Sequence, residues 1–327
     1  MRNRTFGRLG WSVSEIGYGM WGVGAGPGGW QGGDDDESLA SLRLAVELGC
    51  TFFDTAWIYG RGHSEQLLGR LIRDNPGSGL RAATKIPPKD RQWPSRRTSL
   101  LSDVFPHDHI AEYLRLSLDN LGVDRIDLLQ FHVWEDAWLT DDAWLKSVEW
   151  LRSSGAVDGI GISINRWEPW NGVAAVRSGL IDSVQVIYNV FDQNPEDELL
   201  PACREHQVAV IARVPFDEGT LTGTITRQTT FPDDDWRASY FVPENLESSV
   251  AHVEALLAEL PAAADLPDLA LRFILQNPDI ATVIPGMRRP AHVRRNIASS
   301  DGTALPAELM STLRAHRWDR EPTEWSQ

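Results

Sequence analysis

The sequence is poor in cysteine and lacks any long hydrophobic run. Its 327 residues include two cysteines, Cys50 and Cys203, which stand far apart without a CxxC or other metal-ligand spacing. Core packing explains them better than a disulfide or a zinc site. No apolar run approaches the roughly 20 residues that span a bilayer, and the residues after Met1 lack the apolar stretch of a signal peptide. We therefore expect a cytoplasmic protein with no metal and no membrane contact.

Basic residues are also scarce. The chain has 31 lysines and arginines against 46 aspartates and glutamates, a formal net charge of −15. Such a surface repels nucleic acids and anionic lipids, so neither is an expected partner. A small molecule is the expected partner, and the oligomeric state cannot be read from the sequence. Any local group of basic residues must then have a specific purpose.

Short apolar runs alternate with amphipathic segments along most of the chain. The runs are 16–20, 52–54, 81–86, 126–132, 157–163, 184–188, 208–214 and 280–284. Helical patterns follow them near 38–48, 64–73, 110–121, 143–153, 169–177, 198–206, 267–276 and 292–298. Eight such repeats predict an α/β fold, a (β/α)8 TIM barrel, in a single domain spanning 1–327. A doubly wound sheet is the weaker alternative, because no Gly-rich dinucleotide turn follows the first run.

Several segments lie outside the eight repeats. Residues 4–13 predict a β-hairpin that closes the bottom of the barrel, and residues 246–260 and 306–316 predict extra C-terminal helices. Three long irregular segments, 25–36, 87–109 and 217–245, each follow a predicted strand. Loops of this length in a compact domain are usually functional or disordered, so we expect them at the active end of the barrel.

A carboxylate and a phenol stand five residues apart where the second strand gives way to a loop. Asp54 ends that strand in Phe-Asp-Thr-Ala, and Tyr59 follows in Tyr-Gly before Ser64-Glu65 opens a helix. Catalytic residues of α/β barrels come from the carboxyl ends of strands. The alternative is that Asp54 only caps the turn and Tyr59 only packs on the barrel, but the later residues argue against it.

Two more ionisable residues end strands. Lys85 and His132 close the third and fourth runs and should share the rim with Asp54 and Tyr59. A nearby lysine favours the phenolate and is expected to lower the pKa of Tyr59, while a carboxylate keeps the lysine charged. A histidine there can orient a substrate oxygen or relay its proton. Taken singly, Lys85 would be a rim lysine and His132 a core histidine. Their joint occurrence favours acid catalysis by Tyr59.

The motif around Asp54 and Tyr59, with Lys85 and His132, resembles that of the aldo-keto reductase family, and the resemblance runs nearly end to end. It implies a barrel enzyme that transfers hydride between a nicotinamide cofactor and a carbonyl or alcohol. It also implies that Tyr59 is the general acid, that Lys85 and Asp54 tune it, and that His132 orients the carbonyl.

The same resemblance implies a cofactor site along the carboxyl ends of the strands. Ser163 and Gln185 correspond to the residues that bind the nicotinamide carboxamide, although the asparagine usual after that serine is Ile164 here. Arg213 stands where many members place an aromatic ring against the nicotinamide, and a planar guanidinium can stack there. The alternative for Gln185 is a polar residue of the barrel interior. The residues assigned to the cofactor are Met20, Trp21, Asp54, Ser163, Gln185, Arg213, Val214, Pro215, Phe216, Gly219, Leu221, Arg237, Gly286, Arg288, His292 and Asn296.

Four arginines, 288, 289, 294 and 295, gather after the last strand of this acidic chain. They resemble the family's adenosine-binding segment, where a helix N-terminus and arginines accept phosphate. They favour NADPH, with NADH still possible. The alternative is a helix face that balances nearby carboxylates.

The substrate cannot be identified from the sequence. Trp21, Trp57 and Trp134 lie close to rim motifs and are expected to wall the substrate pocket, but aromatic walls suit many carbonyl compounds and sugars. Two functions remain open: an oxidoreductase acting on an aldehyde, a ketone or the corresponding alcohol or sugar, and a nicotinamide-binding regulatory or sensor protein with little turnover.

Overall fold

A computed structural model describes residues 1–24 and 33–323 of the chain. Eight parallel strands form the barrel that the sequence predicts, each paired with the next in chain order. They are β3 (Tyr18–Gly19), β4 (Phe52–Asp54), β5 (Arg81–Ile86), β6 (Ile126–Phe131), β7 (Val157–Ser163), β8 (Ser183–Ile187), β9 (Ala209–Arg213) and β10 (Ile280–Val283). Bridges from Ile16 to Val283 and from Gly19 to Gly286 join the first and last strands and close the barrel.

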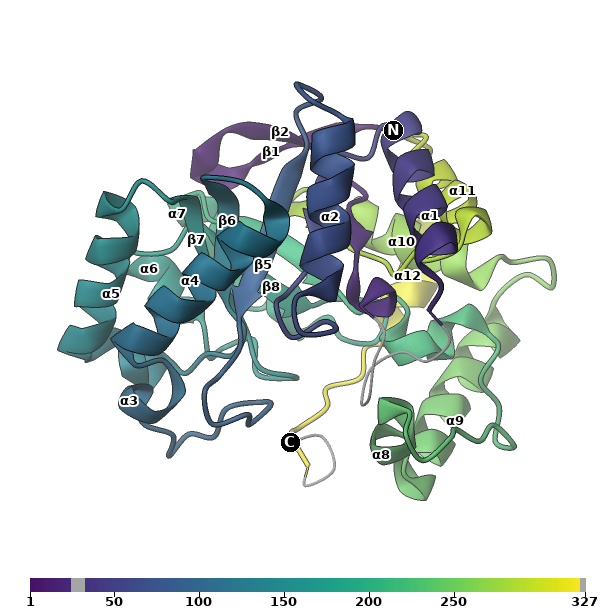
Figure 1. The fold of residues 1–327 in the computed structure, drawn as a ribbon. Coiled ribbons are helices and arrows are strands. Elements are labelled where there is room, and N and C mark those ends of the chain that lie inside the picture. The colour runs from purple at the N-terminus through teal and green to yellow at the C-terminus, as the bar shows by residue number, and fades with distance from the viewer. Residues whose placement is uncertain (25–32, 324–327) are drawn as a thin grey trace.

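A helix follows every strand and packs on the outside of the barrel (Figure 1). These helices are α1 (Asp35–Glu47), α2 (His63–Asp74), α4 (His107–Leu121), α5 (Asp142–Ser153), α6 (Val173–Arg177), α7 (Leu199–His206), α10 (Leu266–Leu275) and α11 (Pro290–Ala298). The predicted extra helices are α9 (Pro243–Glu259) and α12 (Ala307–Ala315), and short helices α3 (Leu101–Val104) and α8 (Trp236–Tyr240) interrupt the long loops. Within the described ranges, no helix is long and apolar enough to cross a bilayer.

Local sequence sets where several helices begin. The side chains of Asp34 and Asp265 accept hydrogen bonds from the backbone N–H groups of Glu37 and Asp268, which caps α1 and α10. The helix predicted at 169–177 starts later, at Val173, because residues 165–171 form separate single turns. Of the long segment 25–36, residues 25–32 lie outside the described part of the chain.

The amino-terminal end of the barrel is plugged by the predicted hairpin, β1 (Asn3–Phe6) paired with β2 (Trp11–Ser14). Phe6 stacks on Phe52 with 5.3 Å between ring centroids and belongs to an apolar cluster with Ala83, Leu128 and Ile211. This cluster fills the lower barrel. Apolar side chains therefore occupy the interior of the barrel at this end.

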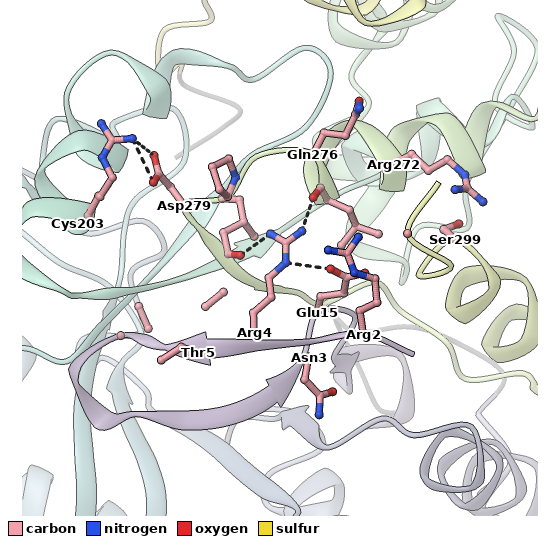
Figure 2. Close-up of a pocket in the computed structure, with 18 of the residues that line it drawn as sticks. Arg2, Asn3, Arg4, Thr5, Glu15, Cys203, Arg272, Gln276, Asp279 and Ser299 are labelled. Atoms are coloured by element: carbon pink, nitrogen blue, oxygen red, sulfur yellow. Dashed lines mark hydrogen bonds and ion pairs between the residues drawn. The ribbon is translucent and has the colours of Figure 1, made fainter. Parts of the chain in front are cut away.

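A cleft of about 760 Å³ lies between the hairpin and the helices beside β10 (Figure 2). The Arg4 side chain lines it, and its guanidinium donates to the carbonyls of Asn277 and Ile280, each at 2.8 Å, and to Glu15 at 2.9 Å. These bonds tie the hairpin to the end of α10 and the start of β10. Polar residues at this end of a barrel usually serve stability, and active sites lie at the other end.

Candidate active site

The predicted ionisable residues meet at the carboxyl end of the barrel. Asp54 ends β4, Lys85 is the penultimate residue of β5, and His132 directly follows β6. The register places Lys85 opposite Gln130, and Ser163 opposite Gln185 on the next strand pair. Parallel strands therefore bring together side chains that the sequence separates by up to 131 residues.

Asp54 and Lys85 form a fully buried ion pair. Lys85 Nζ lies 2.6 Å from Asp54 Oδ2 and 2.7 Å from the carbonyl oxygen of Thr55. Asp54 Oδ1 also accepts hydrogen bonds from the amides of Gln130 at 3.1 Å and Gln185 at 2.8 Å. Burying ionised side chains is costly unless they are paired and hydrogen-bonded in this way. In this structure the Gln185 amide N–H group is bound to Asp54 inside the barrel, which is the alternative role that the sequence left open for Gln185.

Tyr59 lies directly beside this pair. Lys85 Nζ is 5.1 Å from the centroid of the Tyr59 ring. Burial raises the pKa of Tyr59 above its ordinary value; the charge of Lys85 opposes the rise and that of Asp54 adds to it. This corrects the direction expected from the sequence, because loss of hydration outweighs the nearby ammonium. The phenol therefore keeps its proton at neutral pH and can donate it.

His132 faces the same phenol. Its ring lies edge-on to those of Tyr59 and Trp93, both at 5.9 Å between centroids. Burial lowers the pKa of His132 well below its usual range, and the charges of Lys85 and Arg213 lower it further. The imidazole is therefore neutral at physiological pH. Its Nδ1 is buried without a hydrogen-bond partner among the described residues.

Arg213 brings a second cation to the site. Its Nη2 donates to the carbonyl oxygen of Ile164 at 2.8 Å, while its buried Nε has no hydrogen-bond partner within the described ranges. Burial lowers the pKa of Arg213 to about 10, Arg166 acts in the same direction, and Glu218 opposes them. The guanidinium is charged at neutral pH, and its Nε–H group remains available to donate a hydrogen bond.

Five of the residues assigned to the cofactor lie directly after β9. Pro215 and Leu221 are buried, whereas Val214, Phe216 and Gly219 are half-buried. Gly219 has a φ of 110°, a conformation that other residues rarely adopt. Buried Ser163 and Met20 lie nearby on other strand ends, and the Met20 N–H bonds the Asp54 carbonyl at 2.9 Å.

The arginine group after β10 lies before and within α11: Arg288 and Arg289 precede the helix, whereas Arg294 and Arg295 lie inside it. Its positive potential is felt at His292, whose pKa is lowered first by burial and then by Arg289, Arg288 and Arg295. Some of this charge is balanced, since Arg295 pairs with Asp265 at 2.5 Å. Arg237, also assigned to the cofactor, pairs with Asp235 at 2.6 Å. The remaining residues assigned here differ in exposure: Gly286 and His292 are exposed, Arg288 is half-buried and Asn296 is buried.

The three tryptophans expected to wall the substrate pocket differ in position. Trp21 lies 6.3 Å from Tyr59 between ring centroids, and Trp57 lines a cleft of about 490 Å³ with Ile58, Arg61 and Arg91. Trp134 is fully buried, and its ring packs edge-on against Trp144 at 4.7 Å between centroids. A side chain in that position serves core packing and does not wall a substrate pocket.

Four residues near the site were not expected. Gln130 is in β6, two positions before His132, and period-two alternation along the strand could have placed it on the same side. Trp93 and Arg166 lie in loops, and Trp236, 4.7 Å from Trp21 between ring centroids, lies in a short helix. No periodic signal in the sequence points to these three.

Comparison with known proteins agrees with this geometry. The pattern of the Aldo/keto reductase family matches residues 15–317. The chain is 29% identical over 314 residues to the NADH-specific methylglyoxal reductase of Escherichia coli, covering 91% of this chain and 93% of that protein. It is 30% identical over 324 residues to the D-threo-aldose 1-dehydrogenase of a Pseudomonas species, covering 93% and 94%.

A solved structure shares the fold. An aldo-keto reductase of Bacillus halodurans in its holo form superposes with a TM-score of 0.77 and 24% identity, with both chains covered completely. The family pattern spans nearly all of the described residues, the barrel has the same architecture, and the relatives are reductases and dehydrogenases. The chain belongs to the aldo/keto reductase family.

Proposed function

We propose that the protein is an NAD(P)H-dependent oxidoreductase that interconverts an aldehyde or ketone with the corresponding alcohol, with Tyr59 as general acid. Family membership gives carbonyl or alcohol oxidoreduction as the reaction class. The observation that carries the proposal is the Asp54–Lys85 pair fixed beside Tyr59, at the barrel end where active sites lie.

The chain's own residues account for the movement of a proton. The protonated Tyr59 donates to the carbonyl oxygen as negative charge develops there, and the Lys85 ammonium stabilises the phenolate that remains. The neutral imidazole of His132 offers one N–H donor that can orient the same oxygen. In alcohol oxidation, the same residues act in reverse.

The residues present fit a nicotinamide dinucleotide. Arg213 has an orphaned buried Nε, Ser163 is buried at the end of β7, and the arginines around His292 carry the positive charge that favours a bound phosphate. When bound, the cofactor supplies or accepts the hydride. In this proposal Ser163 and Gln185 hold its carboxamide, the loop after β9 holds its pyrophosphate, and Arg288 approaches its adenosine phosphate.

NADPH should bind more tightly than NADH, and Arg288→Ala should narrow the difference about tenfold. The 2′-phosphate of NADPH adds negative charge with which these arginines can pair. A hydrogen bond to a charged group is worth roughly 1.5 kcal/mol or more, which is about tenfold in affinity. Fluorescence titration of both cofactors measures the two affinities, and added salt should reduce the preference.

The matched control is Arg70→Ala, which removes an equal charge from the exposed face of α2. It should leave both affinities unchanged. Equal affinities of the unmodified protein for the two cofactors would reject the NADPH assignment. The comparison of the two cofactors is informative because one relative is named as NADH-specific.

Arg213 should lie flat against the nicotinamide ring. It ends β9 near Tyr59 and has a planar guanidinium with a donor to spare. A crystal structure with NADP⁺ bound checks this directly. A ring face covered by another residue, with Arg213 directed elsewhere, would contradict the stacking.

Turnover separates an enzyme from a nicotinamide-binding sensor. Absorbance at the reduced-nicotinamide band should fall when NADPH or NADH is mixed with a suitable aldehyde or ketone, and rise when the oxidised cofactor is mixed with an aldose or alcohol. Methylglyoxal and D-threo-aldoses are the first substrates to test, because relatives are named for them. Tight cofactor binding without turnover across a broad panel would favour the sensor.

A further inference from the structure

The chain returns to the active end of the barrel after its last helix. From α12 the yellow segment in Figure 1 runs away from the hairpin side. The backbone N–H of Trp318 donates to the carbonyl oxygen of Phe191 at 2.8 Å. The Trp318 ring stacks on His252 at 3.8 Å between centroids with a 7° interplanar angle. These contacts fix Trp318 against the segment that follows β8 and against α9.

Arg320 is the buried anchor of this segment. Its Nε lies 3.1 Å from Asp192 Oδ1, and its Nη2 bonds both Asp192 Oδ2 and, at 2.7 Å, Asp217 Oδ1. The guanidinium also lies over two indoles, 4.8 Å from the Trp167 centroid and 4.5 Å from that of Trp318. Asp192 follows β8 and Asp217 follows β9. One side chain therefore joins two consecutive loops at the active end.

A second connection runs from Arg320 to the same loop. Asn189 Nδ2 donates to Asp192 Oδ2 at 2.8 Å and to the carbonyl oxygen of Val214 at 3.0 Å. Arg320 thus holds the loop after β9 directly at Asp217 and, through Asp192 and Asn189, at Val214.

The backbone of this loop requires such support. Val214, Asp217 and Glu218 have φ angles of 57°, 46° and 54°, in the left-handed region that non-glycine residues seldom adopt. For a β-branched residue such as valine this conformation is a clear outlier. Strained backbone of this kind persists only where surrounding contacts hold it, and it is common at ligand-binding sites.

The held loop leads directly to the candidate active site. Glu218, next to Asp217, pairs with Arg166 at 3.0 Å, and both residues act on the pKa of Arg213. Residues 213–221 include the segment that the proposed function assigns to the cofactor.

We propose that Arg320 is a positioning residue that holds the loop 213–221 in the conformation that receives the nicotinamide cofactor; this inference rests on the proposed function. Without its guanidinium, the buried carboxylates of Asp192 and Asp217 lose their shared cation. The loop then populates other conformations, and the apparent affinity for the cofactor falls in proportion to the competent fraction that remains.

The test compares Arg320→Gln with Arg317→Gln. Arg317 lies three residues earlier and makes exposed ion pairs with Asp197 and Asp319. Hydrogen exchange on the cofactor-free proteins should show faster exchange in residues 213–221 of the Arg320 variant while the barrel strands stay protected. A merely structural loss of stability would raise exchange in the strands as well.

Cofactor binding gives the second measurement. If the competent fraction falls to about a tenth, the Kd for NADPH rises about tenfold, while kcat at saturating cofactor stays within about twofold because the bound state is unchanged. Arg320→Lys, which keeps the charge but lacks the planar fork, should give an intermediate Kd. Arg317→Gln should change neither exchange nor affinity.

Unchanged exchange in 213–221 would show that Arg320 does not hold the loop. Faster exchange with an unchanged Kd would show that the held loop does not receive the cofactor, and it too overturns the inference. If Arg320→Gln fails to fold, Asp217→Asn removes one of the two carboxylates and should raise exchange and Kd in the same direction. If the unmodified protein binds no nicotinamide, the proposed function fails, while the exchange comparison still decides whether Arg320 anchors the loop.

Discussion

Tyr59→Phe should lower the rate of carbonyl reduction by at least about 10²- to 10⁴-fold, the usual contribution of general acid catalysis. The variant keeps an aromatic ring beside Lys85 and removes only the hydroxyl that donates the proton. Cofactor affinity should therefore be nearly unchanged. Steady-state kinetics with the best substrate from the turnover screen, together with a cofactor titration, separates the two effects.

The matched control is Tyr113→Phe, which removes the phenolic hydroxyl of a buried tyrosine on α4 that contacts Arg91 and not Lys85. It should retain most of the rate. Because burial raises the pKa of Tyr59, the unmodified enzyme should keep its reduction rate through neutral pH and lose it only when the phenol ionises at alkaline pH. A Tyr59→Phe protein with more than about a tenth of the rate would show that another group supplies the proton.

Lys85→Met should be comparably severe in rate and should also destabilise the fold. It leaves the Asp54 carboxylate, which is 2% exposed, without its cation. Breaking a buried ion pair by removing one partner typically costs 3–5 kcal/mol, roughly, because the remaining charge is uncompensated. Urea unfolding measures this loss, and the same kinetic assay measures the rate.

Two further variants separate stability from catalysis. Lys89→Met removes an exposed lysine from the loop that follows β5 and should change the free energy of unfolding by no more than about 0.5 kcal/mol. Combining Lys85→Met with Asp54→Asn removes both charges and should recover part of the stability but none of the rate. A Lys85→Met protein of normal stability and rate would remove the basis of the proposed acid site.

The sequence was sufficient to predict the barrel and the meeting of Asp54, Lys85 and His132, because each ends a strand and parallel strands end at one rim. It was not sufficient for properties that depend on burial. The net pKa direction of Tyr59 follows from lost hydration, which no spacing reveals. Closeness in sequence to His132 likewise did not show that Trp134 is packed inside the protein.

Contacts between segments that lie far apart in the chain were also beyond prediction from the sequence. Arg320 meets Asp192 across 128 residues and Asp217 across 103, and no periodic pattern in the last residues of the chain indicates a partner. Asn165, one place beyond the usual position of the family's asparagine, donates instead to Glu135 at 2.8 Å and to the Trp134 carbonyl at 3.0 Å. Only the folded loop shows which neighbours such a residue will meet.

Closure of the barrel has a consequence for the order in which the chain folds. Thr282 donates to the carbonyl oxygen of Ser14 at 2.9 Å across a separation of 268 residues, beside the bridge between Ile16 and Val283. Until the segment around β10 has left the ribosome, the early strand has no partner on that side and its backbone groups remain open to other chains. Closure of the barrel therefore depends on contacts between residues far apart in the sequence and comes late in folding. Until then the unpaired strand edge is prone to aggregation, and chaperones could protect it during synthesis.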